Sequence, residues 1–244
     1  MQIRVINPNT TASMTAKIAA AAEAVAAPGT RITAVQPSFG ARSIEDHLDE
    51  VWAAAGVSEQ VRLGEAAGAD AHVIACFGDP GLHAAREIAR GPVIGIAEAA
   101  FHAATLLATG FSVVTTLTRT CVIAEHLVLQ YGFERRCKGI HGTDIAVLEL
   151  EDPAGDAYAR IRDIAGAALQ RDRSGAIVLG CAGMADLCMQ LQRELGVPVI
   201  DGVSAAVKLA ESLVTLGLST SKRGDYAAPI AKPYIGIAAP FSPG

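Results

Sequence analysis

Two cysteines share one sequence pattern: each follows an apolar, strand-like segment, and each has a glycine two residues later. Cys76 lies in HVIACFG (residues 72–78) and Cys181 lies in IVLGCAG (residues 177–183), so the two segments can be aligned residue by residue. A single free cysteine is usually a small buried hydrophobe. Two unrelated core thiols have no reason to occupy equivalent positions of an internal repeat. The pair therefore indicates a shared chemical role.

Two thiols on opposite faces of one carbon could invert a stereocentre without redox chemistry. One thiolate would remove a proton and the opposite thiol would return one, whereas a single base tends to replace the proton on the face it left. The unperturbed pKa of cysteine, about 8.5, makes both protonation states accessible. We expect each cysteine where a helix begins, with its pKa lowered by the helix amides. The coupled pair would then titrate as one unit.

Turn residues follow both cysteines. GDPG at 78–81 and AG at 182–183 would leave backbone N–H groups free to face a ligand and stabilise an enolate oxygen. An ordinary turn is the alternative. The polar turn NPNTT at 7–11 either caps a helix or also offers Asn9 and Thr10 to a substrate.

The remaining sequence gives no sign of a metal or cofactor. Cys121, Cys137 and Cys188 have no counterpart in the other half, and there is no C-x-x-C or paired-histidine spacing. Neither cysteine segment is a G-x-G-x-x-G or Walker loop. We therefore expect no cofactor.

Short β-branched runs alternate with Ala/Leu-rich helical segments, which predicts an α/β fold with mostly parallel sheets flanked by helices. The expected strands are 3–6, 31–35, 72–75, 93–96, 111–115, 176–179 and 197–200. The expected helices are 11–27, 45–68, 81–89, 97–108, 118–131, 156–171, 184–195 and 204–216.

The repeat extends beyond the cysteines. Residues 91–95 align with 197–201, and residues 5–10 resemble 114–119. Two similar lobes are therefore expected, related by approximate two-fold symmetry. Ligands of open parallel sheets bind at the carboxyl ends of the strands. Both cysteines, Asn7, Asn9, Thr115 and Thr116 are expected at that edge, around one cleft.

Composition narrows the class of protein. The chain has 244 residues, 51% hydrophobic and 18% charged, with a formal net charge of −5. That charge, without a Lys/Arg cluster, argues against nucleic acid as a partner. No apolar stretch approaches the roughly 20 residues of a spanning helix, so no membrane partner is expected. Five cysteines without framework spacing, and no apparent signal peptide, favour the cytoplasm.

Four segments together resemble the hydantoin racemases, in the hydantoin/allantoin racemase branch of the aspartate/glutamate racemase superfamily. They are NPNT at 7–10, ACFGDPG at 75–81, GIAEAA at 95–100 and LGCAGM at 179–184, and the similarity runs from residue 3 to about residue 222. The resemblance implies two pseudo-symmetric lobes, no metal or organic cofactor, and a homo-oligomer. It also implies that the helix after Val203 returns to the first lobe. The lobes would comprise residues 1–97 plus 207–244, and residues 98–206.

The resemblance also assigns site residues. Cys76 and Cys181 would be the acid/base pair, and Phe39 and Ile44 would be apolar walls from the segment PSFG…SIE at 37–45. The family often has Gly after Ser-Ile-Glu, whereas Asp46 follows here, which changes the expected loop shape. The full substrate-binding set is Asn7, Asn9, Phe39, Ile44, Phe77, Gly78, Thr115, Thr116, Ala182 and Gly183.

A hydantoin is a coherent small-molecule substrate. Its C5 hydrogen is acidified by the adjacent carbonyl and nitrogen, and its ring is neutral. An amino-acid racemase would need an Arg or Lys for the carboxylate, and none stands in the cysteine motifs. Racemisation of 5-monosubstituted hydantoins is thus the expected function, with allantoin racemisation as the alternative. An amino-acid racemase, a decarboxylase or cis–trans isomerase relative, and a non-catalytic small-molecule-binding protein remain open.

Overall fold

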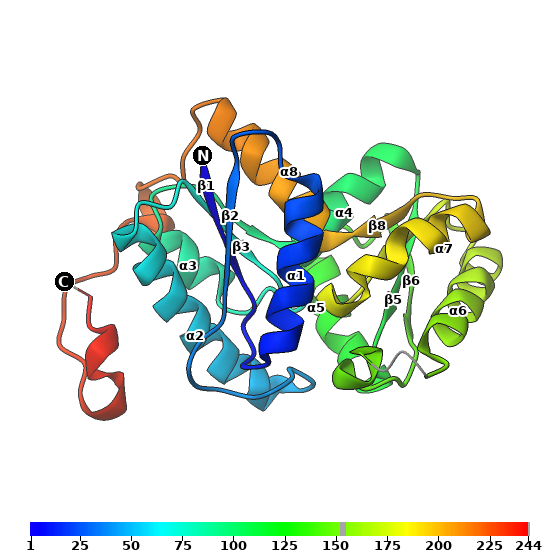
Figure 1. Cartoon of the computed structure of the whole chain (residues 1–244), viewed down its shortest axis with the longest axis horizontal. Coiled ribbons are helices and arrows are strands. Elements are labelled where there is room, and N and C mark those ends of the chain that lie inside the picture. The colour runs from blue at the N-terminus through cyan, green and yellow to red at the C-terminus, as the bar shows by residue number, and fades with distance from the viewer. Residues whose placement is uncertain (152–154, 244) are drawn as a thin grey trace.

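Two four-stranded parallel sheets form the framework of the molecule (Figure 1). The computed structural model describes residues 1–151 and 155–243. The first sheet has the order β2-β1-β3-β4 and the second has β6-β5-β7-β8. The strands are β1 (Gln2–Ile6), β2 (Arg31–Val35), β3 (Ala71–Ile74), β4 (Val93–Gly95), β5 (Phe111–Thr115), β6 (Cys137–Gly142), β7 (Ala176–Leu179) and β8 (Val199–Asp201). The expected α/β class with two similar lobes is confirmed.

Helices follow most strands, as the alternating pattern predicts. They are α1 (Ala12–Val25), α2 (His47–Ala66), α3 (Leu82–Ile88), α4 (Ile96–Leu107), α5 (Cys121–Gln130), α6 (Ala157–Asp172), α7 (Cys188–Leu195) and α8 (Gly202–Thr215). Short 3-10 helices include η1 (Thr118–Thr120), η2 (Val147–Glu151) and η3 (Ala182–Leu187). The expected helix 184–195 is therefore wrong in its first part, since residues up to Leu187 form η3.

Strand β6 has no counterpart in the sequence prediction. Its sequence, CKGIHG, is only half-buried and contains two glycines, so it lacks the apolar run that marks β3 or β7. It is an edge strand, paired with β5 alone. An edge position leaves less of a strand to bury, which is why the pattern was weak.

Strand register fixes how the repeat aligns. Ile6 pairs with Ile74 in the first sheet, and Val114 pairs with Leu179 in the second. Asn7 is therefore equivalent to Thr115. The expected alignment of residues 5–10 with 114–119 is wrong by one residue, because two short apolar strands can be matched by pattern in either register.

The two lobes exchange helices. Helix α8 contacts β3 and β4 of the first sheet, whereas α4 contacts β7 and β8 of the second. The two helices also pack against each other, and a Cβ on Gly202 would lie 2.5 Å from the Ile96 carbonyl oxygen. Because Ile96 and Gly202 begin equivalent helices, the approximate two-fold axis passes close to this crossing. The lobe boundaries at 97/98 and 206/207 stay a prediction.

One apolar core joins the sheets. Buried residues of both lobes, such as Val73, Phe101, Val113 and Val178, belong to a single cluster. Two smaller clusters lie elsewhere, one in each lobe. No helix of the described chain is long and apolar enough to cross a membrane.

Candidate active site

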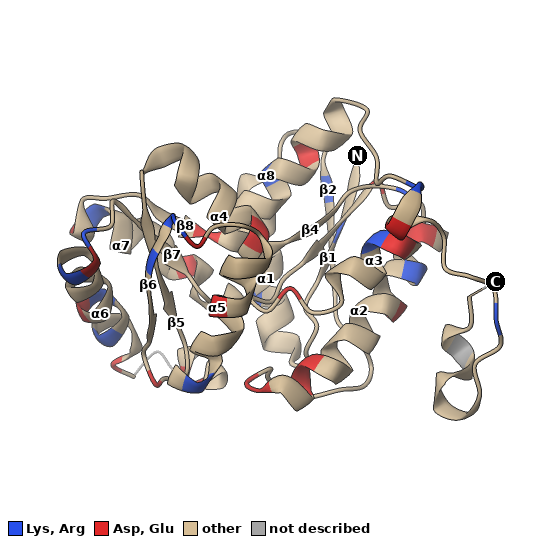
Figure 2. Cartoon of the chain, turned by 180° about the vertical axis from the view of Figure 1, so that it is seen from behind, with Lys and Arg blue, Asp and Glu red and all other residues tan. Residues whose placement is uncertain are grey.

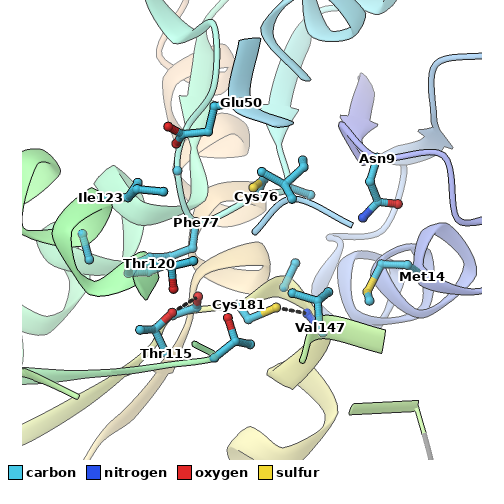
Figure 3. A pocket seen from close by; sticks show the side chains of 18 of the residues that line it. Asn9, Met14, Glu50, Cys76, Phe77, Thr115, Thr120, Ile123, Val147 and Cys181 are labelled. Atoms are coloured by element: carbon cyan, nitrogen blue, oxygen red, sulfur yellow. Dashed lines mark hydrogen bonds between the residues drawn. The ribbon is translucent and has the colours of Figure 1, made fainter. Parts of the chain in front are cut away.

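One pocket lies at the carboxyl ends of β1, β3, β5 and β7 (Figure 3). Cys76 and Cys181 each follow the last residue of their strand, Ile74 or Leu179, by two positions. The structure brings together eleven of the twelve residues expected from the sequence. They are Asn7, Asn9, Ile44, Cys76, Phe77, Gly78, Thr115, Thr116, Cys181, Ala182 and Gly183.

Phe39 is the exception, since the structure does not place it in the pocket of the two cysteines, where the sequence predicted an apolar wall. It lines a different hollow together with Trp52, and its ring meets the edge of Phe241 at a centroid distance of 6.1 Å. The chain turns at Gly40, whose φ of 116° favours glycine, before it reaches Ile44. Residues on the two sides of this turn face different hollows, so only Ile44 borders the cysteine pocket.

Both sulfur atoms face the same pocket in Figure 3. Each cysteine is only partly exposed, and both are free thiols. Burial raises the pKa of Cys181 to about 11 and raises the pKa of Cys76 still further. The expectation of lowered thiol pKa values is therefore wrong for this structure, because loss of hydration disfavours the thiolate.

Both cysteines were expected where a helix begins, and only Cys181 lies at such a position. Cys181 immediately precedes η3, and its Sγ accepts the Gly183 N–H at 3.4 Å. Cys76 instead lies in a turn, and α3 begins only at Leu82. A backbone bond from Gly78 lowers the pKa of Cys76, as the Gly183 bond does for Cys181. These two glycine amides thus face sulfur, not an enolate oxygen as expected.

Neighbouring charges distinguish the two thiols. Asp79 and Glu50 raise the pKa of Cys76, as does Cys181 itself. Lys17 lowers the pKa of Cys181, against a smaller opposing effect of Glu45. A first thiolate is consequently favoured at Cys181, with Cys76 keeping its proton.

The polar residues of the pocket differ in how much hydrogen-bonding capacity they retain. Asn7 Nδ2 donates to Asn9 Oδ1 and to Thr15 Oγ1, both at 2.9 Å, and Thr115 Oγ1 donates to the Gly180 carbonyl at 2.9 Å. No described residue bonds to Asn9 Nδ2, which points toward the pocket in Figure 3. Asn9 is therefore the better placed of the two asparagines to donate to a substrate oxygen.

Asp79 fixes the loop that carries the first cysteine. Its carboxylate accepts N–H bonds from Ala97 and Glu98 at the start of α4, at 3.1 and 3.0 Å. It also accepts the Tyr131 hydroxyl at 2.9 Å. Burial raises the pKa of Asp79 to about 7. This loop is thereby tied to both lobes, since Tyr131 directly follows α5.

Loops from both lobes meet beside the pocket. The Glu45 carboxylate accepts the Val147 N–H at 2.9 Å, and Thr11 Oγ1 donates to the Arg42 carbonyl at 2.7 Å. Ile44 and Val147 are thus held on the same side of the pocket, one from each lobe.

The sequence did not predict eight of the residues that line this pocket. They are Met14, Glu50, Ala75, Thr120, Ile123, Ala124, Val147 and Gly180. Most come from helices and loops without a motif of their own. One signal was available, since Thr120 and Ile123 lie near the start of the helix after β5, and such starts lie at the carboxyl edge of the sheet.

The other cysteines and the histidines lie outside this pocket. Cys188 Sγ donates to the Val199 carbonyl, Cys137 lies in β6, and Cys121 begins α5. Among residues 1–151 and 155–243, no group of three or more His, Cys, Asp or Glu could hold a metal ion.

Comparison with known proteins gives consistent matches. A family model described as Asp/Glu/hydantoin racemase matches residues 3–210. The hydantoin racemase of Pseudomonas sp. (strain NS671) is 48% identical over 97% of this chain and 95% of its own length. That of Rhizobium meliloti is 50% identical over 95% and 96%. A solved allantoin racemase from Klebsiella pneumoniae is 60% identical, with a TM-score of 0.98 and 100% of both chains covered.

Proposed function

We propose that this chain, which belongs to the Asp/Glu/hydantoin racemase family, inverts C5 of 5-monosubstituted hydantoins with Cys76 and Cys181 as the two acid/base residues. The family makes it an isomerase of the racemase type. The proposed chemistry is proton transfer alone and uses no cofactor.

The reaction moves one proton in and one proton out. The thiolate of one cysteine takes the C5 hydrogen as a proton, so the C–H bond breaks, an S–H bond forms and the electron pair passes into the C4 carbonyl. The other thiol then protonates C5 on the opposite face and becomes the thiolate. Substrate and product have the same composition, and the two cysteines have exchanged roles. Asn9 Nδ2 is a candidate donor to the enolate oxygen.

The main support for this proposal is that two cysteines at equivalent positions of the internal repeat line a single pocket. The sulfur of each accepts a hydrogen bond from a glycine N–H. A purely structural role would not require both thiols to face the same space. Because the two cysteines come from separate lobes, they are suited to approach C5 of the substrate from opposite faces.

The charge of the pocket supports a neutral substrate. Among the described lining residues, Glu50 is the only Asp, Glu, Lys, Arg or His. An amino acid or a dicarboxylate would bring a carboxylate with no cation to bind it, and would be repelled by Glu50. A neutral hydantoin ring needs only hydrogen bonds. The amino-acid racemase and decarboxylase alternatives are thereby disfavoured.

Allantoin is a second candidate substrate, since it is the hydantoin with a ureido group at C5. The similarity to the solved Klebsiella pneumoniae allantoin racemase favours it. The two candidates differ only in the C5 substituent, so both use the same proposed chemistry.

The test is C5 proton exchange in deuterated water with optically pure benzyl-, isobutyl- and ureido-hydantoin. We expect loss of optical rotation together with deuterium at C5 for at least one of them. A small-molecule-binding protein would give no exchange above buffer, and that result would reject the proposal.

We further propose that the protein is a cytoplasmic homo-oligomer. Its five free thiols support a reducing compartment.

A further inference from the structure

Glu50 is an unusual residue for the wall of this pocket. It lies in the first turn of α2, where Figure 2 shows acidic residues at the N-terminal end of the helix. Its carboxylate is on the Cys76 side of the pocket, toward Ile123 (Figure 3). Apolar side chains, including Phe77 and Ala124, line the same pocket. A charge in such surroundings costs free energy unless it is hydrogen-bonded.

The two oxygens of this carboxylate are used differently. Oε2 pairs with His47 Nδ1 at 3.2 Å. Oε1 accepts no hydrogen bond from any residue that the structure describes. It lies against Gly78, where a Cβ would be only 2.6 Å away. The side chain is 22% exposed. Glu50 and Gly78 line both this pocket and a second hollow beside His47, so Oε1 is an acceptor without a described partner at the wall between the two.

We infer that Glu50 selects the C5 substituent, favouring hydantoins whose substituent carries N–H donors, such as a ureido group. This inference rests on the proposed function. Gly78 donates to the Cys76 sulfur, and Cys76 faces C5 in that mechanism. A C5 substituent directed between α2 and α5 therefore reaches Oε1.

The three classes of substituent have different consequences at Glu50. A ureido group offers N–H donors, and hydrogen bonds to an ionised acceptor are among the stronger ones. An alkyl group removes water from the carboxylate and returns no hydrogen bond. A carboxyalkyl group adds a second negative charge next to the first. The preference for a donor-bearing neutral substituent follows.

The experiment compares kcat/KM for ureido- and isobutyl-hydantoin in wild type, Glu50→Gln and Glu50→Leu. Glu59→Gln is the matched control, since Glu59 is also on α2 but lines another hollow. We expect wild type and Glu59→Gln to prefer the ureido substrate. The ureido-to-isobutyl ratio should fall by about ten- to a hundredfold in Glu50→Gln, mainly through KM, and further in Glu50→Leu. Circular dichroism checks that each variant folds.

An unchanged ureido-to-isobutyl ratio in both Glu50 variants would overturn the inference. If both rates stay at the wild-type value, Glu50 has no role in turnover, and if both fall by the same factor, its role is structural or catalytic and not selective. Failure of the proposed function is distinct, because wild type would then racemise neither substrate, and the inference would fall with it.

Discussion

At the scale of single residues, the cysteines differ in their charged neighbours, although the repeat makes them equivalent. Glu50 and Asp79 disfavour a thiolate at Cys76, whereas Lys17 favours one at Cys181. The same fold can therefore hold one thiolate and one thiol at a time. Identical environments would give no preferred site for the first ionisation.

The pH dependence of activity follows from these thiols. The proposed mechanism requires one cysteine to be ionised and the other protonated, so kcat/KM should rise with pH as thiolate forms toward the pKa of Cys181, about 11. It should fall only when Cys76, with its higher pKa, also ionises. Initial rates between about pH 7 and pH 10 test this. Activity that is level or declining across that range would contradict it.

The sequence predicted that Cys76 and Cys181 lie in one pocket, whereas it predicted the other walls of that pocket less well. The Cys-x-Gly repeat was sufficient to single out Cys76 and Cys181, because it joins residue type with position on a strand. Glu50 comes from α2 and Val147 from the start of η2, and neither element carries a local pattern that marks it. The direction of the thiol pKa shifts was wrong because it depends on burial, which is a property of the whole fold.

At the scale of elements, the two lobes cap equivalent helices with different carboxylates. Asp201, at the end of β8, accepts the N–H groups of Val203 and Ser204 at the start of α8. The equivalent position of the first lobe is Gly95, and Asp79 occupies its space, since a Cβ there would lie 2.2 Å from Asp79 Cγ. The cysteine loop thus supplies the cap for α4.

Substitution Asp79→Asn should destabilise the protein by about 1–3 kcal/mol at pH 8. The two carboxylate oxygens now accept backbone N–H bonds. In the asparagine, the amide nitrogen replaces one oxygen and cannot accept, so one backbone N–H would face another donor. Urea unfolding measures the change, with the exposed Asp225→Asn as control. A stability equal to wild type would show that Asp79 does not hold this loop.

Substitution Gly180→Ala should displace the second cysteine. The new Cβ would lie 2.6 Å from Thr115 Cβ and 2.9 Å from its Cα, so β7 must move away from β5. We expect a loss of about 1–3 kcal/mol in stability and up to about a hundredfold in kcat/KM.

Gly166→Ala is the control for that substitution. Its Cβ would meet only Leu195 Cδ2 at 3.8 Å, inside α6. It should keep full activity and gain up to about 1 kcal/mol. Equal behaviour of the two variants in kinetics and urea unfolding would contradict the predicted clash.

Buried strands and amphipathic helices were predictable because their patterns come from covered faces. Strand β7, with all four residues buried, appears as the apolar run AIVL. Edge strand β6 does not, and η3 interrupts the helix expected from residue 184. Patterning predicts elements well where burial is complete and poorly where the chain is half-exposed or tightly turned.

At the scale of the whole molecule, exchange of α4 and α8 makes the lobes interdependent. The shared core buries residues of both sheets, and each lobe adds only a smaller buried cluster of its own. The pocket lies between them and takes one cysteine from each. The internal repeat predicted this duplication, whereas the exact register required the strand pairing.

The C-terminal arm, residues 223–243, exposes apolar side chains that support the proposed homo-oligomer. Ile230, Ile235 and Ile237 are 80%, 87% and 85% exposed, which is costly for a monomer in water. We expect sedimentation to give a mass that is a multiple of 25.1 kDa. Deletion from residue 223 onward should reduce that mass toward one chain. A full-length protein that sediments as a monomer at micromolar concentration would contradict the proposal.

Enantiomer-resolved deuterium exchange in Cys76→Ser and Cys181→Ser tests the two-thiol mechanism most directly. Each variant should lose racemisation by about a hundredfold or more, yet still exchange the C5 hydrogen of one enantiomer, and the two variants should exchange opposite enantiomers. Cys188→Ser, which alters a half-buried thiol outside the pocket, should racemise like wild type. Racemisation at the wild-type rate by either pocket variant, or exchange of the same enantiomer by both, would contradict the mechanism.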